Sequence, residues 1–146
     1  MSLAAIHAAI PHRDPFLLLD EIVEESPERI VCRKTFTGNE WFYAGHYPGA
    51  PLTPGVLLCE AALQAGAVLL SQQAKEAAET SAKKVPVATR LNNVRFKRMV
   101  KPGETIEIEV ALTERLADAF FMTGKITVAG KTAATLELAC TMSAAE

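Results

Sequence analysis

The chain has 146 residues, a formal net charge of −2 and 22% charged side chains, and these values limit what it can be. This length suits one domain with one hydrophobic core, so we expect a single domain over residues 1–146. The near-neutral charge excludes a protein whose whole surface binds nucleic acid, and an anionic partner would have to use a local basic patch.

Cysteine usage and the N-terminal segment both bear on where the protein works. The three cysteines, Cys32, Cys59 and Cys140, are odd in number and lack a CxxC spacing. Because their neighbours are apolar, they predict reduced thiols and a cytoplasmic protein. The first residues, MSLAAIHAAIPHRDPF, lack the basic stretch and long apolar core of a signal peptide, so we expect none.

The first part of the chain predicts a short helix, a pair of strands and an irregular loop. Residues 3–10 read as a helix that ends at Pro11. Residues 16–25 are predicted as a strand that pairs with 29–37 across a Ser-Pro turn. The segment 45–55 contains three glycines and three prolines, which exclude regular structure and fix an unusual loop path.

A long helix is predicted after this loop, because no proline interrupts residues 56–78. It is apolar on all sides as far as Leu70 and polar beyond, so we expect an enclosed first half and a solvated second half. The apolar run of about 15 residues is shorter than the roughly 20 that span a bilayer, and it contains Glu60 and Gln64. We therefore expect a core helix and no membrane insertion.

The rest of the chain alternates apolar and polar residues with a period of two, which predicts strands. In the segment VRFKR, Val94 and Phe96 face one side while Arg95 and Lys97 face the other. Further strands are predicted over 104–112, 120–128 and 132–142, which brings the expected total for the chain to about six. A helix that is apolar all round needs cover on every side, so we expect an α+β fold with a curved antiparallel sheet wrapped around the helix.

Three segments carry a resemblance to a known family: PHRDPFLLLDEI, GHYPGAPLTPGVLLCEAALQ and RFKRMVKPGE. They closely resemble the hotdog-fold 3-hydroxyacyl-(acyl-carrier-protein) dehydratases of bacterial type II fatty acid synthesis. The second segment is long and specific, which makes this resemblance far stronger than one based on a single short motif. The resemblance implies the hotdog fold, with its sheet around one long central helix, and a catalytic pair that corresponds to His46 and Glu60.

The resemblance also implies partners. Basic residues in this region of the family bind acyl carrier protein and correspond to Arg95, Lys97, Arg98 and Lys101; a solvated strand face is the simpler reading of that cluster. The substrate would be carried on the phosphopantetheine arm of the carrier, with no further cofactor. Two chains would pair through a continuous sheet, each active site taking its His from one chain and its Glu from the other, and the family also admits a trimer of such dimers.

Dehydration of a 3-hydroxyacyl thioester needs three groups, and the sequence offers one for each. A neutral imidazole can remove the C2 proton at near-neutral pH, which suits His46. Gly55 places a backbone N–H at the start of the helix, where it can stabilise negative charge on the thioester oxygen. A carboxyl group in an apolar site holds its proton more tightly, so Glu60 suits protonation of the leaving hydroxyl. Gln64, at i+4 on the same helix face, can hydrogen-bond the Glu60 carboxyl.

Other reactive side chains are predicted to have structural roles. His7 and His12 lack a comparable motif and read as surface or loop-supporting residues, while Cys59 reads as a small core residue. The His and Cys positions form no metal-ligand cluster, so we expect no metal.

Two other functions stay open from the sequence. One is an acyl thioesterase, in which the helix carboxylate would activate water, and the other is a non-catalytic acyl-binding hotdog protein. In addition, the stretch VPVATRLNNV contains none of the aromatic residues that gate the acyl tunnel in many family members. The sequence therefore leaves the chain length of the substrate open.

Overall fold

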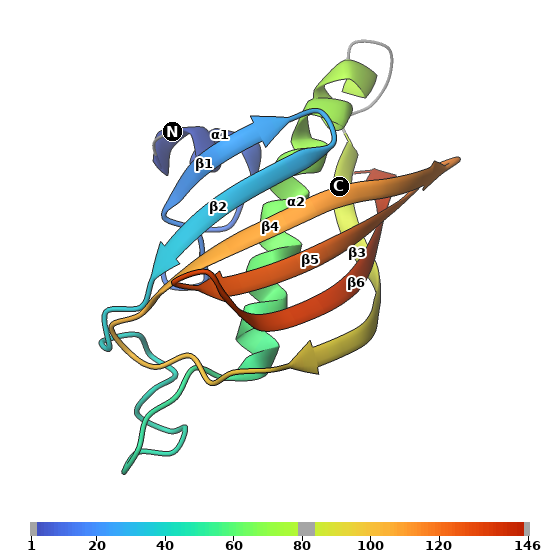
Figure 1. The fold of residues 1–146 in the computed structure, drawn as a ribbon. Coiled ribbons are helices and arrows are strands. Elements are labelled where there is room, and N and C mark those ends of the chain that lie inside the picture. The colour runs from blue at the N-terminus through green and yellow to red at the C-terminus, as the bar shows by residue number, and fades with distance from the viewer. Residues whose placement is uncertain (1–2, 79–83, 145–146) are drawn as a thin grey trace.

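The computed structural model describes residues 3–78 and 84–144 and shows one long helix against a curved sheet (Figure 1). The first half of the chain forms α1 (Leu3–Ala9), β1 (Glu21–Ser26), β2 (Arg29–Thr35) and, after a long loop, α2 (Gly55–Ala78). The second half forms β3 (Lys84–Phe96), β4 (Thr105–Leu116), β5 (Ala119–Val128) and β6 (Lys131–Ala144).

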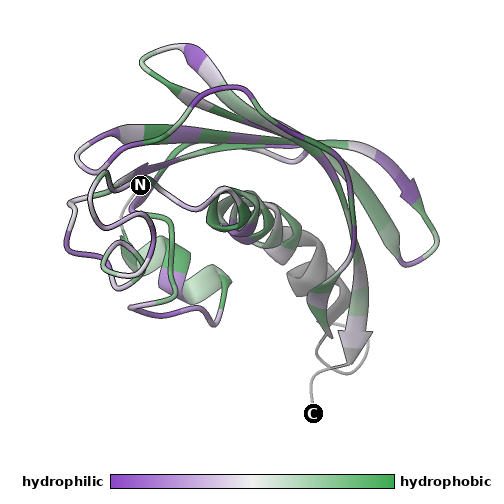
Figure 2. Ribbon diagram, turned by 90° about the horizontal axis from the view of Figure 1, so that it is seen from below, coloured by the Kyte–Doolittle hydropathy of each residue, from purple (hydrophilic) through white to green (hydrophobic). Residues whose placement is uncertain are grey.

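The strands of the described residues form one antiparallel six-stranded sheet in the order β1-β2-β4-β5-β6-β3. The sheet curves around α2, which Figure 2 shows nearly end-on beneath its concave face. This arrangement confirms the predicted α+β hotdog fold with its central helix. Because β3 pairs only with β6 within the described chain, its other edge carries no strand.

Small side chains on α2 allow the sheet to approach the helix closely. Ala61, Ala62 and Ala65 have no exposed surface. On the facing strand, a Cβ atom at Gly124 would lie 3.0 Å from Leu136 Cδ2 of the neighbouring strand and in ordinary contact, 3.5 Å, with Ala62 Cβ of the helix, so the sheet and the helix are closely packed here. The apolar first half of the helix is enclosed from Leu58 to Leu70, as predicted, except that Leu63 and Glu60 are partly exposed, whereas Val56 at its start is 72% exposed. The predicted solvation of its second half falls mainly on 72–78, whose side chains lie outside the described ones.

None of the helices in residues 3–78 and 84–144 is long and apolar enough to cross a membrane.

The prediction of a strand over 16–25 is wrong in its first half, because β1 begins at Glu21. Leu17, Leu18 and Leu19 are buried, but the backbone beside them does not pair with a strand. Instead, the N–H of Leu18 and the carbonyl of Phe16 bond to a side chain of α2. Apolar residues in this segment therefore reflect burial against the helix and not a place in the sheet.

Arginines of β2 form ion pairs with glutamates of both neighbouring strands on the outer face of the sheet. Arg29 pairs with Glu24 and Glu109, and Arg33 pairs with Glu21 and Glu107. Exposed ion pairs of this kind each contribute little to stability. We therefore expect this network mainly to keep β1, β2 and β4 in their order at this edge of the sheet.

Candidate active site

His46 lies in the loop that leads into α2, and a backbone carbonyl determines which of its ring nitrogens carries the proton. Its Nδ1 atom lies 2.9 Å from the carbonyl oxygen of Leu52. A carbonyl can only accept a hydrogen bond, so Nδ1 carries the proton and Nε2 of the neutral ring carries the lone pair. The loop therefore leaves Nε2 of a neutral His46 ring free to accept a proton.

The carbonyl of Leu52 is held in place by its neighbour Thr53, one of the two buried polar side chains described. The Thr53 backbone N–H donates to the carbonyl of Val100 (2.7 Å), and its hydroxyl lies 2.6 Å from the hydroxyl of Tyr43. Burial raises the pKa of Tyr43, so its phenol stays protonated at neutral pH. These contacts anchor the irregular loop to the rest of the fold.

Gly55 is the first residue of α2, where backbone N–H groups have no partner within the helix. A Cβ atom at this position would lie 2.7 Å from Cζ of Phe96, so the ring packs directly against the glycine. A side chain at this position would therefore displace the Phe96 ring, the last side chain of β3.

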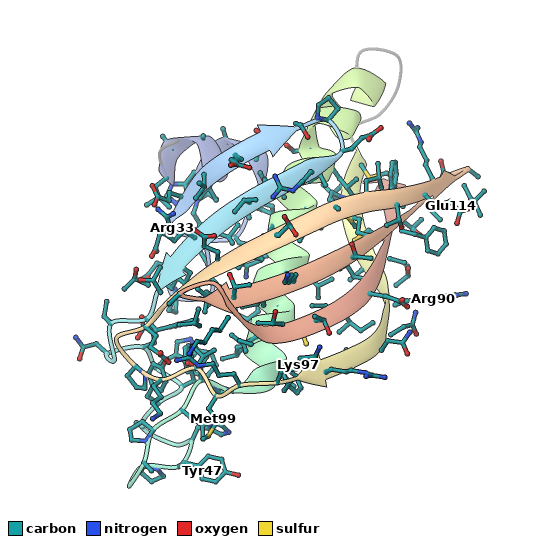
Figure 3. All side chains as sticks on the ribbon, viewed as in Figure 1. Arg33, Tyr47, Arg90, Lys97, Met99 and Glu114 are labelled. Carbon is teal, nitrogen blue, oxygen red and sulfur yellow. The ribbon has the colours of Figure 1, made fainter. Side chains whose placement is uncertain are left out.

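An open pocket of about 770 Å³ lies between this glycine and His46. Its lining includes His46, Tyr47, Gly55, Val56, Phe96 and Met99. Tyr47, Met99 and Lys97 lie at the same end of the molecule in Figure 3. The pocket joins the proposed base to the proposed oxyanion donor and has apolar walls suited to an acyl chain.

Glu60 lies in α2, more than one turn after Gly55, and its side chain is 24% exposed. Gln64, which is fully buried, donates from Nε2 to Glu60 Oε2 (3.0 Å) and to the carbonyl of Phe16 (2.9 Å). Its Oε1 accepts from the N–H of Leu18 (2.7 Å). Gln64 thus holds the Glu60 carboxyl, as its i+4 spacing suggests, and also ties the segment before β1 to the helix.

Glu60 and His46 have different neighbours in one chain. Glu60 contacts Gln64 and His12, whose Nε2 lies 3.9 Å from Glu60 Oε2, and it does not line the pocket beside His46. The contact with His12 was missed by sequence reasoning, which placed that residue at the surface or in support of a loop. The segment PHRDPFLLLDEI was the available signal, because it carries part of the family resemblance.

The predicted basic cluster divides into paired and unpaired side chains. Arg98 donates to Glu104 (2.8 Å) and to the carbonyl of Val128 (3.3 Å), so its guanidinium already has partners. Arg95 and Lys97 are exposed, and the structure gives their side chains no ion pair within the described chain. Arg90 is exposed on the same strand (Figure 3) and was not predicted.

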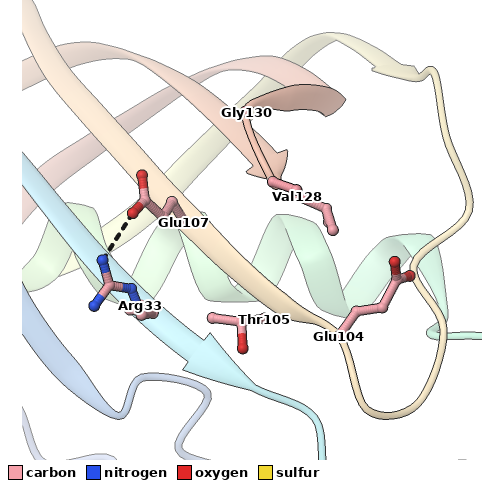
Figure 4. A pocket seen from close by; sticks show the side chains of 7 residues that line it. Arg33, Glu104, Thr105, Glu107, Val128 and Gly130 are labelled. Atoms are coloured by element: carbon pink, nitrogen blue, oxygen red, sulfur yellow. Dashed lines mark hydrogen bonds and ion pairs between the residues drawn. The ribbon is translucent and has the colours of Figure 1, made fainter.

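A second, smaller depression of about 340 Å³ lies near the ends of β2, β4 and β5 (Figure 4). Its charged lining consists of Arg33, Glu104 and Glu107, and Arg33 donates to Glu107 (2.9 Å). Because Glu104 in turn accepts from Arg98, these charges are already matched and the depression lacks a free reactive group.

The cysteines are buried thiols in the described structure. Burial raises the pKa of Cys32 to about 12 and that of Cys140 to about 11, and it also raises the pKa of Cys59. A thiol that holds its proton this strongly is a poor nucleophile, so Cys59 is a core residue beside Glu60. Across the described residues, no group of three or more His, Cys, Asp or Glu side chains is placed to hold a metal ion.

Solved structures with a similar architecture define the fold of the chain. The dehydratase heterocomplex ApeI:P from Xenorhabdus doucetiae matches with a TM-score of 0.78 at 20% identity, covering 94% of this chain and 90% of that one. A hypothetical thioesterase with coenzyme A from Streptococcus pneumoniae TIGR4 matches with a TM-score of 0.66 at 13% identity, over 85% and 88%. At these identities the likeness establishes the hotdog fold alone.

Sequence comparison then gives the family. Residues 10–137 match the model of the FabA-like domain, and the chain belongs to that family. It is 41% identical to the 3-hydroxyacyl-(acyl-carrier-protein) dehydratase FabZ of Staphylococcus carnosus, over 91% of this chain and 89% of that one. It is also 41% identical to the FabZ dehydratase of Geobacter metallireducens, over 92% and 88%. These relatives confirm the predicted resemblance to FabZ-like hotdog dehydratases.

Proposed function

We propose that this protein is a dehydratase of (3R)-hydroxyacyl thioesters on acyl carrier protein, forming trans-2-enoyl thioesters in fatty acid biosynthesis. His46 carries most of this proposal, because its hydrogen bond to Leu52 leaves a basic Nε2 beside the start of α2. The relatives of similar length are named for the same reaction, and the chain covers nearly all of them.

The reaction uses one group for each transferred proton and one for the developing charge. His46 Nε2 takes the proton from C2, and the backbone N–H of Gly55 stabilises the negative charge that moves onto the thioester oxygen. The C3–O bond then breaks as Glu60 gives its proton to the leaving hydroxyl, which departs as water. His46 releases its proton and Glu60 regains one before the next turnover, so the reaction needs no added reductant or oxidant.

Two copies of the chain complete the site in this proposal. Glu60 lies outside the pocket of His46 in the same chain, which supports a site whose carboxyl comes from a partner chain. The free edge of β3 offers the surface for pairing, since Val87 is 46% exposed and Leu91 is 45% exposed along it. A long edge strand with exposed apolar residues is an aggregation risk unless another strand covers it. Pairing of two β3 edges would join both sheets and form a dimer.

Acyl carrier protein is the proposed partner of the unpaired cations near the pocket. Arg95, Lys97 and Lys101 provide positive charge for its acidic surface, whereas Arg98 is bound to Glu104. The phosphopantetheine arm of the carrier would deliver the acyl group into the pocket, and no other cofactor takes part. Three buried thiols fit a reducing compartment, so we place the protein in the cytoplasm as a single hotdog domain.

A direct assay separates this function from the alternatives. The protein is incubated with 3-hydroxybutyryl and crotonyl thioesters while enoyl absorbance and free thiol are followed separately. A dehydratase interconverts the two thioesters without releasing thiol. Release of thiol would show a thioesterase instead, and binding without either change would show a non-catalytic acyl-binding protein.

A further inference from the structure

His12 lies between α1 and β1 and faces the proposed acid of the reaction. Its Nε2 atom lies 3.9 Å from Glu60 Oε2, and its side chain is 27% exposed. The ring is stacked on Phe16, with 6.3 Å between centroids and 15° between the planes. This contact fixes the plane of the imidazole while its Nε2 edge points toward Glu60.

The other ring nitrogen of His12 indicates which tautomer is present. Nδ1 is buried and has no hydrogen-bond partner. A buried N–H without an acceptor is among the rarest features of folded proteins, because its lost hydration is not replaced. The proton therefore belongs on Nε2, and the neutral ring presents an N–H to Glu60.

Both donors near Glu60 address the same carboxyl oxygen. Gln64 Nε2 lies 3.0 Å from Oε2, which is also the atom that His12 faces, and the described residues offer Oε1 no hydrogen bond. The separation of 3.9 Å from His12 is too long for a direct hydrogen bond, so a bridging water or an approach of about 1 Å must close it. Oε1 is thus left free for substrate.

The charged neighbour of His12 in sequence does not compete for Glu60. Arg13 donates to the carbonyls of His7, Ile10 and His12, so its guanidinium is turned toward the end of α1. Glu60 is the charged side chain that the described contacts place against the His12 ring.

We infer that His12 is a positioning residue that stabilises the Glu60 carboxylate during proton transfer. The inference rests on the proposed dehydratase function. As the proton leaves Oε1 for the C3 hydroxyl, negative charge spreads to Oε2, where the Nε2–H of His12 and the amide of Gln64 receive it. These interactions strengthen only as the charge forms, so their loss lowers kcat and leaves KM almost unchanged.

Three substitutions of His12 test which nitrogen matters. The amide nitrogen of Gln reaches about as far as Nε2 of His, whereas the shorter Asn reaches only as far as Nδ1. We expect kcat to fall roughly tenfold in His12→Ala and His12→Asn. In His12→Gln, we expect it to stay within about threefold of wild type, because a neutral donor remains. His7→Ala, which removes another imidazole from the same region, should leave kcat unchanged.

Combination with Glu60→Gln supplies the decisive control. If His12 acts through the Glu60 carboxyl, His12→Ala should cause less than about a twofold further loss in the Glu60→Gln background. Equal losses in both backgrounds, a defective His12→Gln enzyme or wild-type kcat in His12→Ala would each overturn the inference. Absence of dehydration in the wild-type protein would instead refute the proposed function, so the two failures are distinguishable.

Discussion

At the scale of single residues, the bond from His46 Nδ1 to the Leu52 carbonyl decides which nitrogen can react. Glu60 has a comparable constraint, because Gln64 holds one of its two oxygens. Neither constraint depends on the charge of a distant group. Each of these two proposed catalytic side chains is instead oriented by a neutral donor or acceptor within a few residues of chain, which gives both a fixed direction before substrate arrives.

Removal of either reactive group should abolish most of the activity without unfolding the chain. We expect His46→Ala to lower kcat for 3-hydroxybutyryl thioester by roughly 10²- to 10⁴-fold, because the C2 proton then has no base. Glu60→Gln should lower kcat by roughly 10²-fold or more, since the amide cannot supply a proton. Circular dichroism and thermal unfolding of both variants should match wild type. Normal turnover in either variant would remove that residue from the mechanism.

At the scale of elements, the contact of β3 with the first residue of α2 shapes the pocket. The last residue of the strand, Phe96, occupies the space that a side chain at Gly55 would need. The position of the Phe96 ring therefore depends on where α2 begins. The absence of a side chain at Gly55 lets the end of β3 come close to the helix.

A pair of substitutions tests this contact. Gly55→Ala should displace the Phe96 ring and reduce kcat/KM about tenfold or more, because a misplacement near 1 Å disturbs catalytic geometry. Addition of Phe96→Leu should recover part of the loss, since the smaller side chain leaves room for the new methyl group. The measurement is a double-mutant cycle on kcat/KM. If the two losses simply multiply, the loss in Gly55→Ala does not come from the contact with Phe96.

The cations of β3 and the segment after it form the second testable feature at this scale. Charge reversal at Arg95 and Lys97 should raise KM for carrier-linked substrate, and added salt should have the same effect on wild type. A short thioester without the carrier should be turned over normally. Lys125→Glu, which reverses one exposed charge on β5, serves as the control for each single reversal. Similar losses on both substrates would instead assign the cluster to folding.

The elements also show what sequence patterns can and cannot predict. The apolar helix and the alternating strands follow from short-range hydrophobic patterns, and the irregular loop follows from its glycines and prolines. The family motif adds the position of the proposed site. The segment before β1 was mispredicted because the hydrogen bonds of Phe16 and Leu18 go to Gln64, far away in sequence. The approach of His12 to Glu60 was missed for the same reason, since no local pattern encodes a contact between such distant residues.

At the scale of the whole molecule, the single chain places His46 in the lining of the pocket and Glu60 outside it. Its sheet also ends in an unpaired strand. Pairing of two chains through β3 would account for both features. The same dimer would cover the free strand edge and complete two equivalent sites.

Mixing of inactive variants tests the shared site. His46→Ala chains and Glu60→Gln chains, allowed to exchange subunits, should regain activity. In a mixed dimer one site receives both lesions and the other receives neither, so it should run at about half the wild-type rate if the sites are independent. Each variant mixed with itself is the control. Heterodimers shown to form without any recovery would place both residues of a site in one chain.

With its single amide side chain, Gln64 makes the hydrogen bonds to the backbone of Phe16 and Leu18 that the edge of a strand would otherwise make. A neighbouring strand would offer the same donor and acceptor to alternate residues, but it could not also reach Glu60. Here the single residue Gln64 secures the N-terminal segment to the core and orients Glu60, the proposed acid. Stability and reactivity are consequently linked at this position, so a substitution cannot retune one without disturbing the other. A substitution that changes the reactivity of Glu60 without changing stability must therefore fall on a different neighbour, and His12 is such a neighbour.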